Sequence, residues 1–464
     1  MAIASKPSSP SRPDRVFLAS LGCAKNLVDS EVMLGRLASD GWALTTDAGD
    51  ADAIVVNTCS FIDPAKAEST DEILRYAGEK RNGQLLIVAG CLAQRYGAEL
   101  RELVPEIDAV VGTGAFPKIR EIIEEARSGA RPLHLEDRDE YIDRLGFLPR
   151  VVTTPRATAY LKISEGCNHI CAFCIIPTLR GLGKSRTIES LVAEATALVE
   201  GGAQELVIVA QDTSDYGRDI GMRDGLAQLI EAFESIDGLR WVRLLYLYPT
   251  SVTKRIVDAM RASTKVVPYV DMPLQHSHPH VLKAMRRPPQ PERYLELFDE
   301  IRTALPGATI RSTFIIGFPG ETDEHFEHML SFIERAKLDR AGFFEYSREE
   351  GTAAYAMGDR VPVRVKRERI GRARDLQRAI SNSNDAARIG ERLEVLVEQR
   401  RLIPASSTIR QALGTRLVSV GRSMREAPGV DGNVYIAGEH LIGSFVNCTI
   451  NGHTEFDRFG TLAG

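Results

Sequence analysis

Short apolar runs alternate with helix-like stretches through the first 130 residues. The predicted strands are residues 16–18, 53–56, 85–88 and 109–111; predicted helices begin near Asn26, Pro64 and Gln94, and a fourth ends near Arg127. This alternation is typical of a parallel sheet that helices cover on both faces. We therefore expect an N-terminal α/β domain over residues 15–130. Residues 1–14 are rich in Ser and Pro and lack an apolar core segment, so we predict a disordered tail and not a signal peptide.

A second alternating series follows a segment in which the pattern is lost. Residues 131–154 gain Arg, Asp, Pro and Gly, which indicates a linker. The predicted strands after it are residues 159–163, 205–210, 241–247, 266–272, 310–316 and 342–346, with apolar-periodic helical stretches between them. Six strand–helix units predict a full or partial α/β barrel of the TIM type over residues 155–385.

The last part of the chain has a different pattern. Between Asp359 and Arg378 eight Arg or Lys accompany three acids, and apolar residues recur at helical spacing. This predicts an amphipathic basic helix, whose charges either face solvent or contact RNA. Short β-type runs then follow at 393–397, 417–420, 433–436 and 446–450, separated by Gly, Pro and Asp. They predict a small all-β module over residues 386–464.

Composition narrows the class of protein. The 464 residues are 44% hydrophobic and 26% charged, which is enough apolar material for packed cores. The net charge of −5 argues against binding nucleic acid through bulk charge. No run of about 18 apolar residues occurs, so we expect no membrane span and a cytoplasmic protein. The seven cysteines are an odd number and are scattered, which favours reduced thiols as metal or cluster ligands over disulfides.

Three cysteines lie close together directly after the first strand of the predicted barrel. Cys167, Cys171 and Cys174 form a C-x3-C-x2-C motif within eight residues. Three soft thiolates can bind one face of a cubic iron–sulfur cluster, and without a fourth ligand nearby one iron stays open to a chelating molecule. The alternatives are a zinc site or structural cysteines, but zinc sites usually combine C-x2-C pairs with four ligands. The motif therefore favours an iron–sulfur cluster.

Three further cysteines share a position relative to the predicted strands. Cys23, Cys59 and Cys91 each follow the carboxyl end of a strand in the N-terminal domain. In an open parallel sheet these ends lie along one edge, where ligands bind. For any one of them, packing as a small buried residue is the simpler interpretation. Their common position favours a second cluster with an open iron, whereas Cys448, alone in the β module, is predicted to be a structural thiol.

The motif with Phe173 before its last cysteine resembles the radical S-adenosylmethionine (SAM) superfamily. The resemblance implies that the amino and carboxylate groups of SAM chelate the open iron, and that one-electron reduction releases a 5′-deoxyadenosyl radical. It also implies that Phe173 lies near the adenine. The superfamily's Gly-Gly-Glu segment is replaced by Ala210-Gln211-Asp212, so Gln211 is the expected contact there. Two family-like stretches, 273–285 and 313–322, add Gln275 and Thr313 as expected cofactor contacts.

A longer stretch is similar to the methylthiotransferase family. It comprises Gly166 to His169, Phe173 to Pro177, Arg180-Gly181 and Ser185-Arg186. That family joins a three-cysteine domain, a radical SAM barrel and a C-terminal TRAM β-barrel, the order predicted above. The resemblance implies two 4Fe–4S clusters, one on Cys23, Cys59 and Cys91 that holds the transferred sulfur, and one on Cys167, Cys171 and Cys174 that cleaves SAM.

The family divides mainly by substrate, into enzymes for a tRNA adenosine and an enzyme for an aspartate of small-subunit ribosomal protein twelve. Residues 20–31, 209–214 and 421–432 resemble the protein-modifying enzyme. The stretch 425–464 contains two Arg and five acids, and a module that grips RNA phosphates should be basic. We therefore expect methylthiolation of the aspartate β-carbon, with a tRNA adenosine as the alternative. Hydrogen-atom abstraction suits this carbon, since its neighbouring charged carboxylate stabilises a carbanion poorly. The expected partners are protein twelve, free or on the ribosome, and an electron donor such as flavodoxin or ferredoxin, with the enzyme itself a monomer.

Overall fold

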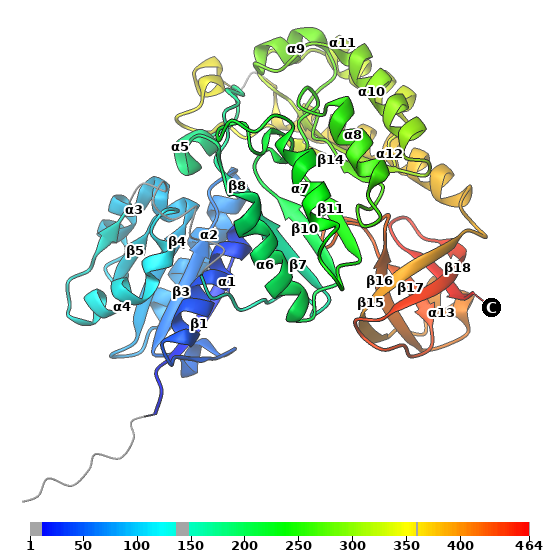
Figure 1. Ribbon diagram of the computed structural model, residues 1–464. Coiled ribbons are helices and arrows are strands. Elements are labelled where there is room, and N and C mark those ends of the chain that lie inside the picture. Colours follow the sequence, from blue (N-terminus) through cyan, green and yellow to red (C-terminus); the bar gives the residue numbers. More distant parts are fainter. Residues whose placement is uncertain (1–11, 136–147, 359–360, 464) are drawn as a thin grey trace, which may run out of the picture. The chain divides into compact units, whose positions relative to one another are not determined.

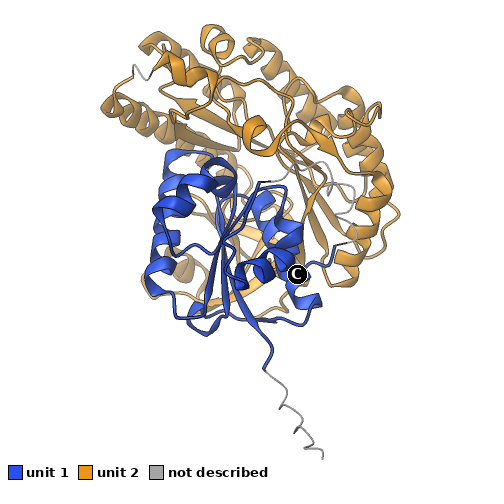
Figure 2. Ribbon diagram, turned by 90° about the vertical axis from the view of Figure 1, so that its left-hand side faces the viewer, with its two compact units in different colours: residues 1–151 blue, residues 152–464 orange. Residues whose placement is uncertain are grey.

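The computed structural model describes residues 12–135, 148–358 and 361–463. Residues 1–11 of the predicted tail, 136–147 of the predicted linker and 359–360 of the predicted basic helix lie outside the described residues. The chain divides into two compact units, Met1–Val151 and Val152–Gly464, which Figure 2 colours separately. Within the described ranges, no helix is long and apolar enough to cross a membrane.

The first unit is a six-stranded parallel sheet with helices on both faces (Figure 1). Its strand order is β2-β1-β3-β4-β5-β6. The strands are β1 (Arg15–Ser20), β2 (Ala43–Leu44), β3 (Ala53–Thr58), β4 (Leu85–Gly90), β5 (Ala109–Val111) and β6 (Leu133–His134); the helices are α1 (Ala24–Ser39), α2 (Asp63–Glu79), α3 (Cys91–Leu103) and α4 (Ile119–Arg127). Val55 packs in the core with α1 and α4, whereas its neighbours Ile54 and Val56 pack with α2 and α3. The buried strands read as continuous apolar runs because both faces are covered.

Residues 131–135 and 148–151 of the predicted linker belong to this first unit. β6 lies inside the range 131–154 and adds to the sheet beside β5. Two-residue strands such as β2 and β6 are too short to show a period in the sequence. After the undescribed stretch, Arg150 Nε donates to Glu31 Oε2 of α1 at 2.8 Å, and the Glu31 side chain is fully buried. The domain boundaries at 130, 154 and 385 stay predictions.

The second unit begins with a partial α/β barrel of six parallel strands. They form two three-stranded sheets, β11-β10-β7 and β12-β13-β14, with a parallel bridge from Val242 to Val266 between them. The strands are β7 (Thr158–Lys162), β10 (Glu205–Val209), β11 (Trp241–Leu244), β12 (Tyr269–Asp271), β13 (Thr309–Ile316) and β14 (Arg340–Glu345); the helices are α5 (Ile176–Arg180), α6 (Ile188–Glu200), α7 (Gly225–Phe233), α8 (Lys254–Ala262), α9 (Pro279–Ala284), α10 (Pro291–Ala304), α11 (Asp323–Ala336) and α12 (Val363–Ala386). Helices α6, α7 and α8 lie on the outside of the first sheet (Figure 1). A short antiparallel ribbon, β8 (Ser164–Glu165) and β9 (Lys184–Ser185), brackets the cysteine motif.

The C-terminal part is a closed five-stranded barrel, as the β-type runs predicted. Its order is β15-β16-β17-β19-β18, and the elements are β15 (Arg392–Leu402), α13 (Thr408–Leu413), β16 (Leu417–Ser423), β17 (Val434–Ala437), β18 (Phe445–His453) and β19 (Arg458–Leu462). The sequence pattern missed β19. Its first residue, Arg458, is buried against Asp385 of α12 at 2.6 Å, so a charged residue stands where an apolar one would have marked the strand.

Buried ion pairs attach this small barrel to the strands of the α/β barrel. Arg422 at the end of β16 donates to Glu205 Oε2 of β10 at 2.5 Å, and Arg243 of β11 donates to Glu205 Oε1 at 2.8 Å. All three side chains are at most 1% exposed. Burial alone would raise the pKa of Glu205, but the two guanidinium charges outweigh it and lower the pKa to about 2. Tyr269 of β12 adds a 2.6 Å hydrogen bond to Asp431.

The predicted basic helix is α12, and acids of the same unit pair with several of its charges. Arg369 contacts Glu321 and Asp323, Arg372 contacts Glu327 of α11, and Arg378 contacts Glu455 of the small barrel. Several of the basic side chains therefore join α12 to neighbouring elements instead of facing solvent or RNA. The sequence pattern alone does not indicate this role.

Candidate functional site

The C-x3-C-x2-C motif lies at the carboxyl end of β7, between β8 and α5. Gly166 opens the loop with φ +80°, and a Cβ there would lie 2.1 Å from the carbonyl oxygen of Leu182. A glycine is required because the loop passes this close to the 181–182 backbone. Cys167 N then donates to Gly181 O at 3.0 Å. These contacts hold the first cysteine against the turn between α5 and β9.

The three thiols are partly exposed, and their surroundings suit ligands of a soft metal group. Burial raises the pKa of Cys167 to about 11 and that of Cys174 to about 12, so both are thiols until a metal displaces the proton. Arg287 Nη1 points at Cys171 Sγ over 3.7 Å. A guanidinium beside a ligand sulfur favours the negative charge of a cluster bound there. The donor set and its cationic neighbour fit a 4Fe–4S cluster.

Arg287 belongs to a stack of side chains that surrounds the cysteine loop. Its guanidinium carbon lies 4.4 Å from the ring centroid of Tyr248, and its Nη2 donates to Pro273 O at 2.7 Å. Tyr248 in turn stacks on His169, with ring centroids 3.7 Å apart. His169, inside the motif, forms a 2.6 Å contact with Asp212 beyond the end of β10. The loop is thus attached to the ends of two barrel strands and to the segment after α9.

A buried cluster of charged side chains lies where the cysteine loop begins and ends. Glu165 accepts from Lys162 at 2.7 Å, from Arg180 at 2.9 and 3.0 Å, and from Gln211 Nε2 at 2.6 Å. Burial alone would raise the pKa of Glu165, but Arg180 and Lys162 outweigh it and hold the pKa well below its usual value. The carboxylate is therefore ionised and locks the two ends of the loop together.

The four residues that we predict to bind SAM do not all contact one another. Gln275 has φ +72° and is bonded to Thr313 through its backbone, with Gln275 N to Thr313 O at 2.8 Å. Phe173 instead packs against an apolar cluster that includes Phe318. Gln211 uses its amide nitrogen on Glu165, and its buried Oε1 has no hydrogen-bond partner among the residues that the structure describes. An unpaired buried acceptor suits a donor group of a ligand. The role of these four residues stays a prediction.

The alternating histidines follow β12, and α11 extends the group. The first of them, His276, is fully buried, whereas His280 is exposed. His278 lies with its ring centroid 4.1 Å from that of His325 and 5.0 Å from that of His328. Burial and the neighbouring imidazoles lower the pKa of His278 to about 4, so the ring is neutral at pH 7.

In the first unit, the turns that contain Cys23, Cys59 and Cys91 touch one another. Gly22 has φ +87°, and a Cβ there would lie 2.6 Å from Cys59 Cβ and 2.9 Å from its sulfur. The turn before Cys91 approaches the same strand end, since a Cβ on Gly90 would lie 2.5 Å from Thr58 O. The structure therefore brings the three predicted cysteines to one edge of the sheet.

Helix ends and polar side chains hold this edge. Cys23 is the N-cap of α1 and Cys91 the first residue of α3, so both lie where the helix dipole favours negative charge. Asn26 Nδ2 donates to Leu21 O at 2.7 Å, and Asn57 Nδ2 donates to Asn26 O at 2.9 Å. Three sulfurs at one edge of the sheet, two of them at helix N-termini, fit a second iron–sulfur cluster. No group of three or more His, Cys, Asp or Glu in the described ranges is arranged for a single metal ion.

Cys448 stands apart from both sets. It is fully buried in the core of the small barrel, beside Ile436 and Ile450. Burial raises its pKa to about 11, so it is a protonated, unreactive thiol. None of the seven cysteines forms a disulfide.

Three family models match the chain: uncharacterized protein family UPF0004 at residues 15–112, the radical SAM superfamily at 161–333 and the TRAM domain at 389–462. Among solved structures, the radical SAM methyltransferase TsrM from Kitasatospora setae, with cobalamin and a 4Fe–4S cluster bound, is similar with a TM-score of 0.54. It is 15% identical and covers 74% of this chain and 77% of its own. That likeness supports the fold alone. Fold and cysteine loop together define a radical SAM protein.

Curated relatives narrow this class. The ribosomal protein uS12 methylthiotransferase RimO of Desulforamulus reducens is 44% identical over 97% of this chain and 99% of its own. The enzyme of the same name from Geobacter sulfurreducens is 45% identical over 97% and 98%. The chain belongs to the RimO family of radical SAM methylthiotransferases. Its cofactors are SAM and two 4Fe–4S clusters.

Sequence reasoning identified the cysteines but missed the side chains that hold them. Lys162 and Glu165 were detectable as charged residues at the end of an apolar strand, and His169 stands inside the motif. Tyr248 and Arg287 gave no signal, because they reach the loop only through the packing of distant segments.

Proposed function

We propose that this enzyme methylthiolates the β-carbon of an aspartate in small-subunit ribosomal protein uS12. The supporting observation is the pairing of two three-cysteine sites, each at the carboxyl ends of parallel strands, in a chain similar over nearly its full length to enzymes named for uS12. The bound clusters and SAM supply radical generation and sulfur transfer. The protein itself orients the substrate, excludes water and holds the ligand sulfurs.

The cysteine sets have separate roles in this proposal. Cys167, Cys171 and Cys174 bind the cluster at which SAM is cleaved, with Phe173, Gln211, Gln275 and Thr313 around the cofactor. Cys23, Cys59 and Cys91 bind the cluster that presents the methylthio group. The partially exposed first set suits access by a small molecule, whereas Cys59 and Cys91 are at most 9% exposed.

Partners and compartment follow from this chemistry. We propose that the enzyme acts as a cytoplasmic monomer on uS12, free or on the ribosome, with flavodoxin or ferredoxin as electron donor. A tRNA adenosine is the second candidate substrate. The charges of residues 425–464 favour the protein, because both arginines of this stretch are engaged internally, Arg425 with Glu391 and Arg458 with Asp385. They are not available to RNA phosphates.

Mass spectrometry tests the substrate. Intact uS12 from cells with the gene should be heavier than uS12 from cells without it by one methylthio group in place of a hydrogen, on the aspartate. Reintroduction of the gene should restore the increment. An unchanged uS12 together with a loss of 2-methylthio nucleosides from tRNA would establish the second candidate instead.

Arg287 should set the reduction potential of the cluster on its loop. Its cation stabilises the more negative, reduced form, and a charge-assisted hydrogen bond is worth about 1.5 kcal/mol. For a one-electron couple this corresponds to roughly 60 mV. We expect Arg287→Gln to lower the midpoint potential by about that amount in EPR-monitored titration, with Cys23, Cys59 and Cys91 replaced by Ala so that one cluster remains.

Arg286→Gln is the matched control, since Arg286 is the adjacent, exposed arginine. It should leave the potential unchanged. An equal potential in Arg287→Gln with a fully loaded cluster would contradict the assignment.

A further inference from the structure

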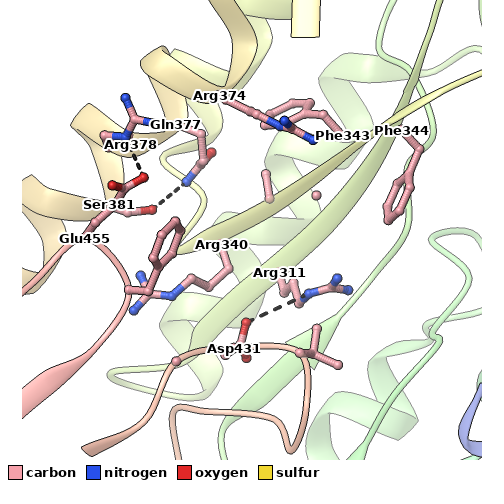
Figure 3. Close-up of a pocket in the computed structure, with 15 residues that line it drawn as sticks. Arg311, Arg340, Phe343, Phe344, Arg374, Gln377, Arg378, Ser381, Asp431 and Glu455 are labelled. Carbon is pink, nitrogen blue, oxygen red and sulfur yellow. Dashed lines mark hydrogen bonds and ion pairs between the residues drawn. The ribbon is translucent and has the colours of Figure 1, made fainter. Parts of the chain in front are cut away.

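A cavity in the second unit lies away from the cysteine loop, at the edge of the α/β barrel. It has a volume of about 650 Å³, and Figure 3 shows its lining. Strand β14 forms one wall, α12 forms another with Arg374, and Val430 and Phe456 of the small barrel close it. Every one of these residues belongs to the second unit.

The cavity touches the backbone edge of β14. Residues Arg340 to Phe344 line it consecutively, although successive side chains of a strand point to opposite faces. A wall of consecutive residues is therefore a strand edge. β14 is the last strand of the order β12-β13-β14, and within the described ranges it pairs with β13 alone. Gly342 at its middle has no side chain to cover the backbone. An edge of this kind presents hydrogen-bonding groups that another extended chain can pair with.

The side chains around this strand edge indicate which kind of ligand can bind there. Phe344 is 48% exposed, Phe456 64% and Val430 47%, and all three line the same cavity, so exposed apolar surface gathers there. Arg374 is exposed and has no ion-pair partner among the described residues.

The other arginines of the cavity are already paired. Arg311 contacts Asp271, Arg340 contacts Asp385 and Arg378 contacts Glu455. One cation beside an apolar strand edge suits an extended peptide that carries a carboxylate.

β14 leads from the cavity to the radical site. Tyr346, directly after the strand, packs in one apolar cluster with Ala172, which lies between Cys171 and Cys174. A strand of this length spans on the order of 20 Å at about 3.3 Å per residue. A peptide paired along β14 would therefore be delivered with its end at the cysteine loop.

We propose that an extended segment of the protein substrate binds as an added strand on β14, with an acidic side chain on Arg374 and apolar side chains on Phe344 and Phe456. The inference rests on the proposed function, because it takes a protein as substrate. A single-stranded RNA could also place a phosphate on Arg374, but it would not use the strand edge. The acids that pair with Arg369, Arg372 and Arg378 also leave no continuous basic surface on α12.

Changes to the backbone of a substrate peptide test whether it pairs with β14. The probe is a fluorescein-labelled peptide that spans the target aspartate of uS12, and its affinity for the full-length enzyme is measured by anisotropy. Two further peptides are N-methylated at alternate residues, one in each register. An added strand donates from one register only, so one methylated peptide should bind at least about tenfold more weakly and the other as tightly as the parent. Equal binding of all three peptides would overturn the proposal.

Arg374→Glu tests the charge, with Arg364→Glu as the control from the same helix, also exposed and without an ion-pair partner among the described residues. Arg374→Glu should weaken the peptide about tenfold and raise KM with kcat unchanged, and Arg364→Glu should change neither by more than about twofold. Loss of binding to a single-stranded ribosomal RNA probe, with unchanged peptide affinity, would overturn the proposal in favour of RNA.

Assays of the wild-type enzyme distinguish a failure of the proposed docking site from a failure of the proposed function. If it methylthiolates intact uS12 while Arg374→Glu and the methylated peptides behave as the parents do, only the docking site fails. If it does not modify uS12 at all, the proposed function fails.

Discussion

Cys171→Ala should reduce the release of 5′-deoxyadenosine from SAM to background. Cys171 is the middle one of the three proposed ligands in the loop and is the one that Arg287 contacts at 3.7 Å. With two thiolates left, the loop cannot bind three irons of a cube and leave the fourth for SAM. We expect the anaerobically reconstituted variant to hold about half the iron of the wild type, because the cluster of the first unit is unaffected. Chromatography of the nucleoside product and iron analysis measure both effects.

Cys448→Ala is the control for this variant. Its thiol is fully buried in the small barrel and has no part in either site. Iron content and SAM cleavage should equal those of the wild type. Wild-type rates of cleavage in Cys171→Ala would remove the loop as the site of radical formation.

Glu205→Gln should be among the most destabilising single substitutions in the chain. Glu205 lies between Arg243 and Arg422, and all three side chains are at most 1% exposed. Removal of the central charge leaves the buried Arg243 without this counter-ion and leaves Arg422 with Glu398 alone. Breaking a buried ion pair on one side typically costs about 3–5 kcal/mol of unfolding free energy. Thermal and denaturant unfolding of the variant should show this loss.

The same carboxylate gives a pH dependence with a definite sign. Its pKa is lowered from the ordinary value of 4.5 to about 2 in the folded protein. A lowered folded-state pKa stabilises the fold at pH values above the unfolded-state pKa. The wild type should therefore lose this contribution as the pH falls from about 4.5 towards 2, and Glu205→Gln should lack it.

Glu394→Gln is a matched control. Glu394 pairs with Arg240 at 2.5 Å and likewise joins the small barrel to the α/β barrel, but the two side chains are 30% and 45% exposed. An exposed pair contributes at most about 1 kcal/mol, so the melting temperature should barely change. Equal losses in both variants would mean that burial of Glu205 does not matter.

Much of the fold is readable from the sequence because buried parallel strands are continuous apolar runs. β3 and β4 are fully buried and were predicted to within two residues. The strands that we did not predict are not continuous apolar runs of this kind. β6 has two residues, and β19 begins with Arg458, whose burial depends on Asp385 far away in the chain. A buried charge can be recognised only when its partner is known.

Some residues of the candidate site could likewise be predicted from the sequence, and others could not. The cysteines were detectable, because one set is a local motif and the other repeats at strand ends. The convergence of Cys23 and Cys59 depends on Gly22, where a single methyl group would collide with the Cys59 sulfur. The Arg287–Tyr248–His169 stack joins three distant segments, and no local pattern indicates such a contact.

The attachment of the small barrel to Glu205 affects how the enzyme is made. Glu205 and Arg422 are 217 residues apart, and chains grow at about 5–20 residues per second. On a translating ribosome, Glu205 and Arg243 would thus wait on the order of 10 to 40 s for Arg422 to be synthesised. Nascent chains halted before β16 would contain every cysteine of both cluster sites and still lack one of the charges that complete the barrel.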